Sequence, residues 1–128
     1  EKLKKEIQNH SGVSLTRATG IISSIMEKSQ IAIVSNGRTV YELAHMNIPA
    51  IVVSQHKREN AHYFASEKNG FIDIGIYKSE LFEELVLKNL KKLINNHDYR
   101  YECFNKLKQH SFSSNKNKIM MKIDELLN

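Results

Sequence analysis

The sequence predicts an α/β fold, namely a partial doubly wound, Rossmann-like parallel sheet of three to four strands followed by a helical C-terminal tail. Two observations support this prediction. Through residues 1–78, short apolar runs alternate with helix-like segments across short connections, which is typical of right-handed βαβ units. Within residues 79–128, apolar side chains recur only at helical spacing. We therefore expect an α/β unit over 1–78 and a helical extension over 79–128 that packs on it.

The composition is that of a globular domain. The 128 residues are 41% hydrophobic and 26% charged, with one proline and five glycines. This length allows a sizeable core, and no apolar run approaches the roughly 20 residues that a membrane-spanning helix needs. We therefore expect a cytoplasmic protein without a transmembrane segment. The single cysteine, Cys103, excludes an internal disulfide and a cysteine-based metal cluster, and we expect it to be an inert thiol.

The first part of the chain predicts a helix, a strand and a second helix. Residues 1–9 place two apolar side chains four positions apart, and a glycine follows shortly after them. Residues 13–17 alternate apolar and polar side chains, which favours a strand. Residues 19–28 carry apolar side chains at helical spacing, with Thr19 as the expected N-cap.

Three continuous apolar runs predict the buried strands of a parallel sheet. These runs are 31–34, 50–53 and 71–74. The segments between them, 39–46 and 57–68, have one apolar face each and predict the crossover helices. The tail then predicts three further helices over 79–94, 99–109 and 115–127.

Basic residues are concentrated in the tail. Between Lys88 and Lys122 there are nine Lys and Arg residues and two acidic residues, which gives this region a net charge of +7. The rest of the chain has a net charge of −2, so the total is +5. A solvated lysine-rich helical surface is the interpretation that we favour over a nucleic-acid interface, and no nucleic-acid partner is expected. The aromatic residues of this region are expected in the core or at an interface rather than stacked on bases: Tyr99, Tyr101, Phe104 and Phe112.

Two polar loops follow the first two predicted strands. In a doubly wound sheet, ligands bind outside the carboxyl ends of the strands, so these loops are expected to lie at the same edge. The first loop contains a glycine and leads directly into a helix, which directs backbone N–H groups and the positive end of the helix dipole toward an anion. The candidate binding residues are Ser35, Asn36, Gly37, Arg38, Thr39 and Glu42 from the first loop and helix, and Gln55, His56, Glu59 and Asn60 from the second loop.

A structural role is an alternative for both loops. Thr39 and Glu42 have the T-x-x-E spacing of a capping box, which needs no ligand. Ser54 would likewise cap the second helix, with Glu59 favouring its dipole. The cations Lys57 and Arg58 are unusual in a first helical turn and favour an anionic ligand nearby.

Metal and catalytic chemistry have little support in the sequence. The chain has six histidines, and no pair has the i, i+4 spacing of a helical metal site. No serine, histidine and acid combine locally into a triad. We therefore expect no metal, no cofactor and no catalytic residue in this chain.

The order of these motifs resembles a known family. A strand, a small-residue loop with T-x-x-E, a strand that follows a proline, and a loop with Gln and Glu/Asn occur in sequence within residues 29–75. This run is similar to the C-terminal domain of GT-B glycosyltransferases related to peptidoglycan N-acetylglucosaminyltransferase. Within that group it is most similar to the UDP-sugar hydrolase of pseudaminic acid synthesis and to similar domains fused to acylneuraminate cytidylyltransferases. The resemblance covers 13–75, about half of the chain.

The resemblance implies specific roles for several candidate residues. The backbone of 35–39 would hold the diphosphate of a UDP-sugar, with Arg38 adding a charge-assisted contact. Glu42 would accept hydrogen bonds from the ribose hydroxyls. Gln55, with Glu59 and Asn60, would face the sugar or the diphosphate.

The chain also departs from the family pattern. The family's C-terminal domain begins with two further strands and a glycine-rich loop, and its N-terminal domain supplies the catalytic histidine; neither region is in this chain. The resemblance therefore implies a UDP-sugar-binding half-domain of an enzyme of bacterial surface-polysaccharide or nonulosonic (sialic-like) acid synthesis, with the catalytic base in an N-terminal domain of the same polypeptide. A homodimer is the other partner considered. The alternatives are a noncatalytic interaction or oligomerisation module fused to a cytidylyltransferase, and a basic nucleic-acid binder.

Overall fold

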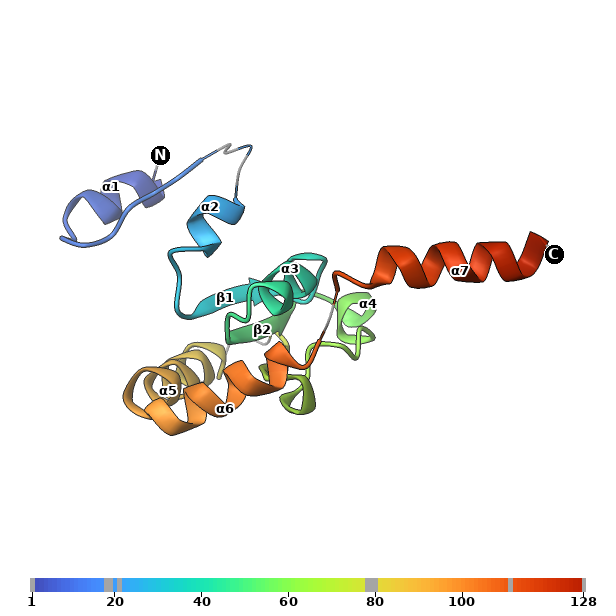
Figure 1. Ribbon diagram of the computed structural model, residues 1–128. Coiled ribbons are helices and arrows are strands. Elements are labelled where there is room, and N and C mark those ends of the chain that lie inside the picture. The colour runs from blue at the N-terminus through green and yellow to red at the C-terminus, as the bar shows by residue number, and fades with distance from the viewer. Residues whose placement is uncertain (1, 18–19, 21, 78–80, 111, 128) are drawn as a thin grey trace.

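The computed structural model describes residues 2–17, 20, 22–77, 81–110 and 112–127 (Figure 1). It is an α/β structure with a parallel sheet and flanking helices, so the predicted fold class is confirmed. In chain order the elements are α1 (Lys2–Gln8), α2 (Ser23–Met26), β1 (Ala32–Ser35), α3 (Thr39–His45), β2 (Ala50–Ser54), α4 (Lys57–Asn60), the 3-10 helix η1 (Glu67–Asn69), β3 (Phe71–Ile76), α5 (Phe82–Asn95), α6 (His97–Lys108) and α7 (Asn115–Leu127).

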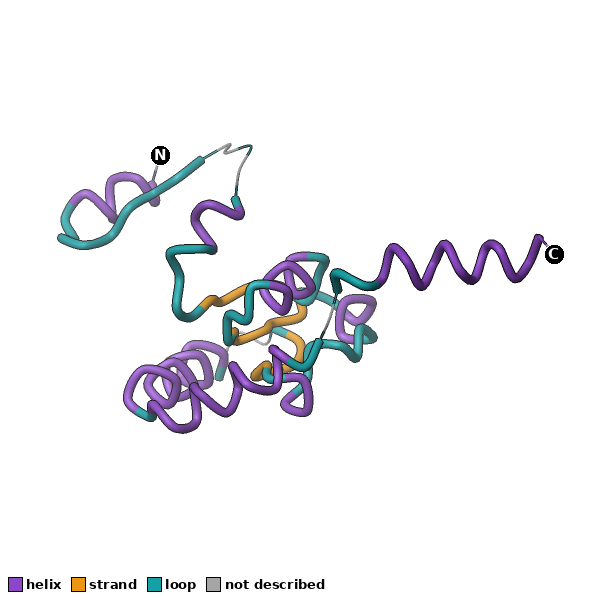
Figure 2. Tube along the Cα trace, viewed as in Figure 1, coloured by secondary structure: helices purple, strands orange, loops and turns teal. Residues whose placement is uncertain are grey.

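The sheet has three parallel strands in the order β1-β2-β3. Ala32 of β1 pairs with Ala50 of β2, which in turn pairs with Phe71 of β3. All five residues of the central strand β2 are buried, which is the pattern of a strand covered on both faces. Figure 2 shows the strands enclosed between α3 and the pair formed by α5 and α6.

Alternating side chains of β2 enter two separate cores. On one face, Ala50 and Val52 pack with apolar residues of α3 such as Leu43. On the other face, Ile51 packs with Leu93 of α5. Helix α6 contributes to both cores, with Leu107 in the first and Cys103 in the second.

Helix α6 approaches the amino end of β3 at Gly70. This residue ends η1 in the left-handed conformation, with φ of 91°. A Cβ atom at this position would lie 2.5 Å from the carbonyl oxygen of Cys103 and 2.9 Å from Cγ of Leu107. Glycine is therefore required both by the backbone conformation and by the close approach of α6.

Two predicted elements are wrong. Residues 13–17 are not a strand: they are irregular, and Val13 and Leu15 are 53% and 41% exposed. An alternating pattern forms a strand only where a neighbouring strand accepts its backbone hydrogen bonds, and none of the described strands lies beside it. The helix predicted over 57–68 is also wrong, because α4 ends at Asn60 and only the short η1 follows it.

The other elements match their predictions with shifted ends. The helix predicted over 19–28 is reduced to α2, and its expected cap Thr19 lies outside the described residues. Helix α5 is seen from Phe82, with residues 79 and 80 also outside the described part, and α6 begins two residues earlier than predicted. Strand β1 begins and ends one residue later than predicted. Strands β2 and β3 begin as predicted and end one and two residues later, respectively.

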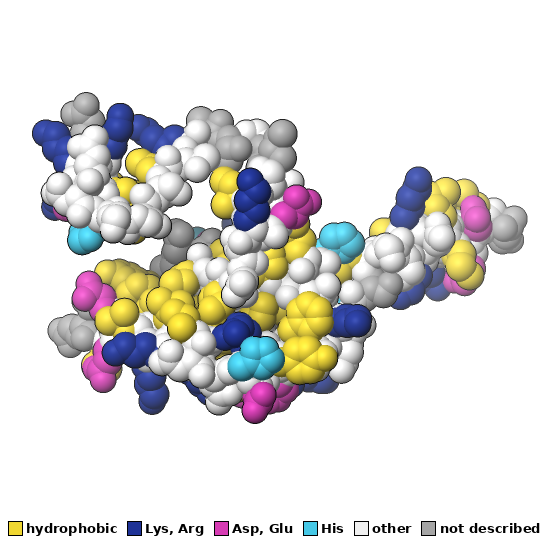
Figure 3. Space-filling view, turned by 60° about the vertical axis from the view of Figure 1, so that its left-hand side comes forward, with side chains coloured by type: hydrophobic (Ala, Val, Ile, Leu, Met, Phe, Trp, Pro, Cys, Tyr) yellow, Lys and Arg dark blue, Asp and Glu magenta, His cyan; other side chains and the backbone are white. Residues whose placement is uncertain are grey.

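Two helices extend away from the sheet. Helices α1 and α7 contain no buried residue, and Figure 1 shows both outside the body formed by the strands, α3, α5 and α6. In Figure 3, α7 exposes apolar and basic side chains together. Among the described residues, no helix combines the length and the apolar character needed to cross a membrane.

In α6, Tyr99 is half-buried and Cys103 is almost fully buried. Burial raises the pKa of the Cys103 thiol, and the side chain is almost fully buried, which agrees with the expected inert thiol. Burial also raises the pKa of Tyr99 to about 12, with the neighbouring Cys103 adding to the shift. The ammonium group of Lys92 lies 3.5 Å from the centre of the Tyr99 ring.

We expect Gly70→Ala to destabilise the protein strongly. The new methyl group would meet the backbone of α6, and the residue would keep a strained positive φ, so the loss should be about 3 kcal/mol or more in urea-induced unfolding. Gly75→Ala is the matched control, because Gly75 also has a positive φ but has open space around its Cβ position. Its loss should be about 1 kcal/mol. Equal losses in the two variants would contradict the close approach of α6.

We expect the free energy of unfolding to fall in alkaline solution. An unfolded tyrosine loses its proton near a pH of about 10, whereas folded Tyr99 keeps it to about 12. The stabilisation from this proton is complete below pH of about 10 and is lost as the pH rises toward 12. Urea unfolding at increasing pH measures the loss. The Tyr99→Phe variant should lose less free energy of unfolding over this pH range, and the loss that remains should arise from the Cys103 thiol. If the variant loses as much as the unmodified protein, Tyr99 is excluded as a cause.

Candidate functional site

The loops that follow β1 and β2 meet at the carboxyl edge of the sheet, as predicted for these two polar loops. Asn36, which is 2% exposed, connects them. Its Nδ2 donates to the backbone carbonyl of His62 at 3.1 Å and to Oγ of Ser54 at 3.4 Å. The backbone carbonyl oxygen of Asn36 lies 2.9 Å from Nδ1 of His62. Asn36 and His62 therefore form a reciprocal contact, the Asn36 clamp, between segments 26 residues apart.

The second loop is ordered by its own side chains. The backbone N–H of Gln55 donates to the carboxylate of Glu59 at 2.8 Å. The backbone N–H of Glu59 in turn donates to Nδ1 of His56 at 3.3 Å, which makes His56 the N-cap of α4. The prediction that Ser54 caps this helix is wrong, because Ser54 is buried in β2 beside Asn36. The reciprocal capping arrangement thus occurs in the second loop.

The predicted capping box of the first loop does not form. The N-cap of α3 is Arg38 rather than Thr39, and no side chain bonds to the first turn of this helix. The first backbone bonds run from Val40 to the carbonyl of Gly37, at 3.2 Å, and from Tyr41 to Arg38. In the described part of the chain, the N–H groups of Arg38 and Thr39 donate to no backbone acceptor. These two groups are open to an incoming anion.

The candidate residues are divided between two hollows. Ser35 and Gln55 line a hollow of about 290 Å³ that Tyr77 and Phe82 also line. Glu42 instead lines a hollow of about 560 Å³ on the outer side of α3, between α2 and Phe112. The structure therefore brings the loops after β1 and β2 together but places the Glu42 carboxylate beside a separate space.

Positive charge surrounds the two loops. Arg38, Lys57 and Arg58 are exposed at this edge, and none forms an ion pair among the described residues. Glu59 is the acidic member of the second loop, and its carboxylate accepts from Gln55. Asn60 is exposed and Gly37 half-buried. No set of histidine, cysteine or carboxylate side chains in the described ranges could hold a metal ion.

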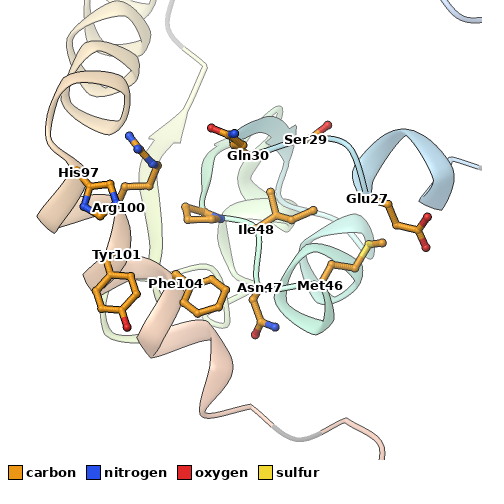
Figure 4. Close-up of a pocket in the computed structure, with 11 residues that line it drawn as sticks. Glu27, Ser29, Gln30, Met46, Asn47, Ile48, His97, Arg100, Tyr101 and Phe104 are labelled. Atoms are coloured by element: carbon orange, nitrogen blue, oxygen red, sulfur yellow. The ribbon is translucent and has the colours of Figure 1, made fainter.

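Two features of the site were not visible in the sequence. His62 was not a candidate residue, and its contact with Asn36 depends on the turn that replaces the expected helix after Asn60. A second space opens at the amino edge of the sheet, opposite the predicted one. This amino-edge cleft has a volume of about 670 Å³ and lies between α6 and the segments that lead into β1 and β2 (Figure 4).

The chain matches no family model, no curated protein and no solved structure.

We expect Asn36→Ala to destabilise the protein and to loosen the second loop. The variant leaves the carbonyl of His62 without the amide donor in a half-buried position, which should cost about 2 kcal/mol in thermal or urea unfolding. Amide exchange of residues 60–65 should accelerate. Asn60→Ala is the control, because this amide is exposed in the same loop and should change stability little. Equal stability of both variants would show that the Asn36 clamp does not order the site.

Proposed function

We propose that the chain is the UDP-sugar-binding part of a GT-B-type glycosyltransferase or UDP-sugar hydrolase of bacterial surface-sugar synthesis. The observation that supports it best is the Asn36 clamp, which joins the loops after β1 and β2 at the carboxyl edge of a parallel sheet. This is the edge at which doubly wound sheets bind nucleotides. The sequence resemblance assigns the same two loops to the nucleotide sugar.

The chemistry of the first loop suits a diphosphate. The open N–H groups of Arg38 and Thr39 and the guanidinium of Arg38 supply donors and positive charge. The exposed cations Lys57 and Arg58 add to the positive potential from the second loop. In this proposal the Gln55 side chain, which shares a hollow with Ser35, contacts the sugar or the diphosphate.

The ribose would occupy the hollow beside Glu42. This carboxylate lies about one helical turn beyond Thr39, and two oxygens of a carboxylate can accept hydrogen bonds from a pair of neighbouring hydroxyls. Because no capping box uses Glu42, its side chain is available for this role. Met26, Tyr41 and Phe112 also line this hollow and give it an apolar wall.

The reacting groups belong elsewhere in this proposal. A base from an N-terminal domain of the same polypeptide would activate water or an acceptor hydroxyl for attack at the anomeric carbon, and UDP would leave with its charge on the loop after β1. Strand β1 pairs on one side only among the described strands. Its other edge is where the further strands of the resembled family would pair.

A second candidate function is a noncatalytic interaction module. Helix α7 supports it, because its apolar side chains lie at helical spacing and are all exposed. Those residues are Ile119, Met120, Met121, Ile123, Leu126 and Leu127. Such a surface is more typical of a helix that packs against a partner than of a solvated tail.

We expect UDP to bind the protein and Glu42→Ala to weaken that binding. Loss of hydrogen bonds to a charged acceptor should raise the dissociation constant about tenfold, as measured by isothermal titration calorimetry. Glu67→Ala is the matched control, because Glu67 is an exposed glutamate before β3, at the amino edge of the sheet, and should leave UDP affinity unchanged.

Two results would contradict this account. Unchanged UDP affinity in Glu42→Ala would remove Glu42 from the ribose role. Absence of UDP binding to the unmodified protein would contradict the proposed function as a whole and favour the interaction module.

A further inference from the structure

The amino-edge cleft is lined on one side by α6 and on the other by the segments before β1 and β2. Its volume of about 670 Å³ falls within the range of small-molecule sites. Ile48 and Pro49 are buried and form its floor. The cleft lies at the opposite edge of the sheet from the hollow that Ser35 and Gln55 line, and it adjoins the hollow on the outer side of α3 at Met46, which lines both.

Three rings on α6 form one wall of this cleft. His97, Tyr101 and Phe104 are four and three residues apart, so they lie on the same face of the helix. The planes of His97 and Tyr101 differ by 9°, and those of Tyr101 and Phe104 by 12°, with centroids just over 6 Å apart in each pair. Tyr101 is 57% exposed, so much of its surface faces solvent rather than the core. The wall presents nearly parallel aromatic surfaces to a flat ligand.

The opposite wall carries amide groups. Figure 4 shows Asn47 on the side of Phe104 and Gln30 on the side of Arg100. No hydrogen bond of the Gln30 or Asn47 side chain joins it to another residue within the described ranges. A carboxamide combines a donor and an acceptor in one plane, which matches the alternating donors and acceptors along the edge of a nucleobase.

Arg100 supplies a fixed cation at one end of the cleft. Its Nη1 donates to the carbonyl oxygens of Leu93 and Ile94 near the end of α5. This anchoring leaves Nη2 and Nε as further donors, and it reduces the side-chain entropy that binding would otherwise cost. Glu27 lies at the other end of the cleft (Figure 4). An anionic group on the ligand would therefore lie near Arg100.

We propose that the amino-edge cleft binds a mononucleotide, with its base on Tyr101 and Phe104 and its phosphate at Arg100. A flat ring, a hydrogen-bonding edge and an anionic group are the three features that the two walls and Arg100 complement. A purely apolar ligand would leave the amides of Gln30 and Asn47 unpaired, and a bare anion would leave the aromatic wall exposed. This site is independent of the proposed UDP-sugar site.

The test is a titration of the full chain with adenosine 5′-monophosphate, followed by NMR. We expect the largest backbone and side-chain shifts at Gln30, Asn47, Arg100 and Tyr101. Tyr101→Ala should raise the dissociation constant about tenfold, the typical effect of removing one stacking ring. Adenosine should bind more weakly than its monophosphate because it lacks the group that Arg100 binds.

A matched control separates this cleft from the other edge of the sheet. Tyr63→Ala removes a tyrosine that is 87% exposed and outside the cleft, so it should leave the affinity unchanged. Three results would overturn the proposal. The shifts could be confined to residues 35–45 and 50–60, outside the cleft. Tyr101→Ala could leave the affinity unchanged, or inorganic phosphate alone could produce equal shifts.

Discussion

The complete burial of β2 is the constraint on which the rest of the structure depends. A central strand without a solvent-facing side chain needs apolar cover on both faces of the sheet. Helix α3 supplies this cover on one face and α5 on the other, and α6 joins the two cores through Cys103 and Leu107. Gly70 allows that junction, because any side chain there would meet the backbone of α6. Gly70, which immediately precedes β3, therefore determines how closely α6 packs against the sheet.

This arrangement gives the two ends of the sheet different surfaces. At the carboxyl end, polar loops converge on the buried amide of Asn36, and exposed cations surround them. At the amino end, α6 lies close enough to the sheet for its aromatic face to oppose the segments that enter β1 and β2. The polar end is suited to phosphate and sugar hydroxyls, whereas the aromatic end is suited to flat rings. Packing that stabilises the fold thus determines the chemistry available at each edge.

The sequence predicted the parts of the fold that carry their own local signal. The three strands were identified because runs such as Ile51–Val53 are apolar at successive positions, a pattern that requires burial on both faces. The predicted strand at 13–17 does not form, because an alternation of apolar and polar side chains does not by itself provide a neighbouring strand to pair with. The helix beyond Asn60 failed because contacts from distant residues, the clamp and the stacking of Phe64 on Tyr41, compete with local helical preference. His62 and the amino-edge cleft depend entirely on such distant contacts, so no local pattern indicated them.

Structural use of polar residues also narrows the candidate site. Asn36, His56 and Glu59 already form hydrogen bonds that order the two loops, so their orientation is set by the fold. Ser35, Arg38 and Gln55 are not used in that way, apart from their backbone groups. In the proposed function, a nucleotide sugar would therefore contact mainly backbone N–H groups, cations and the Glu42 carboxylate, with the Asn36 clamp holding the loops in position beneath it. Such a division reconciles the capping and ligand interpretations, because they apply to different residues of the same two loops.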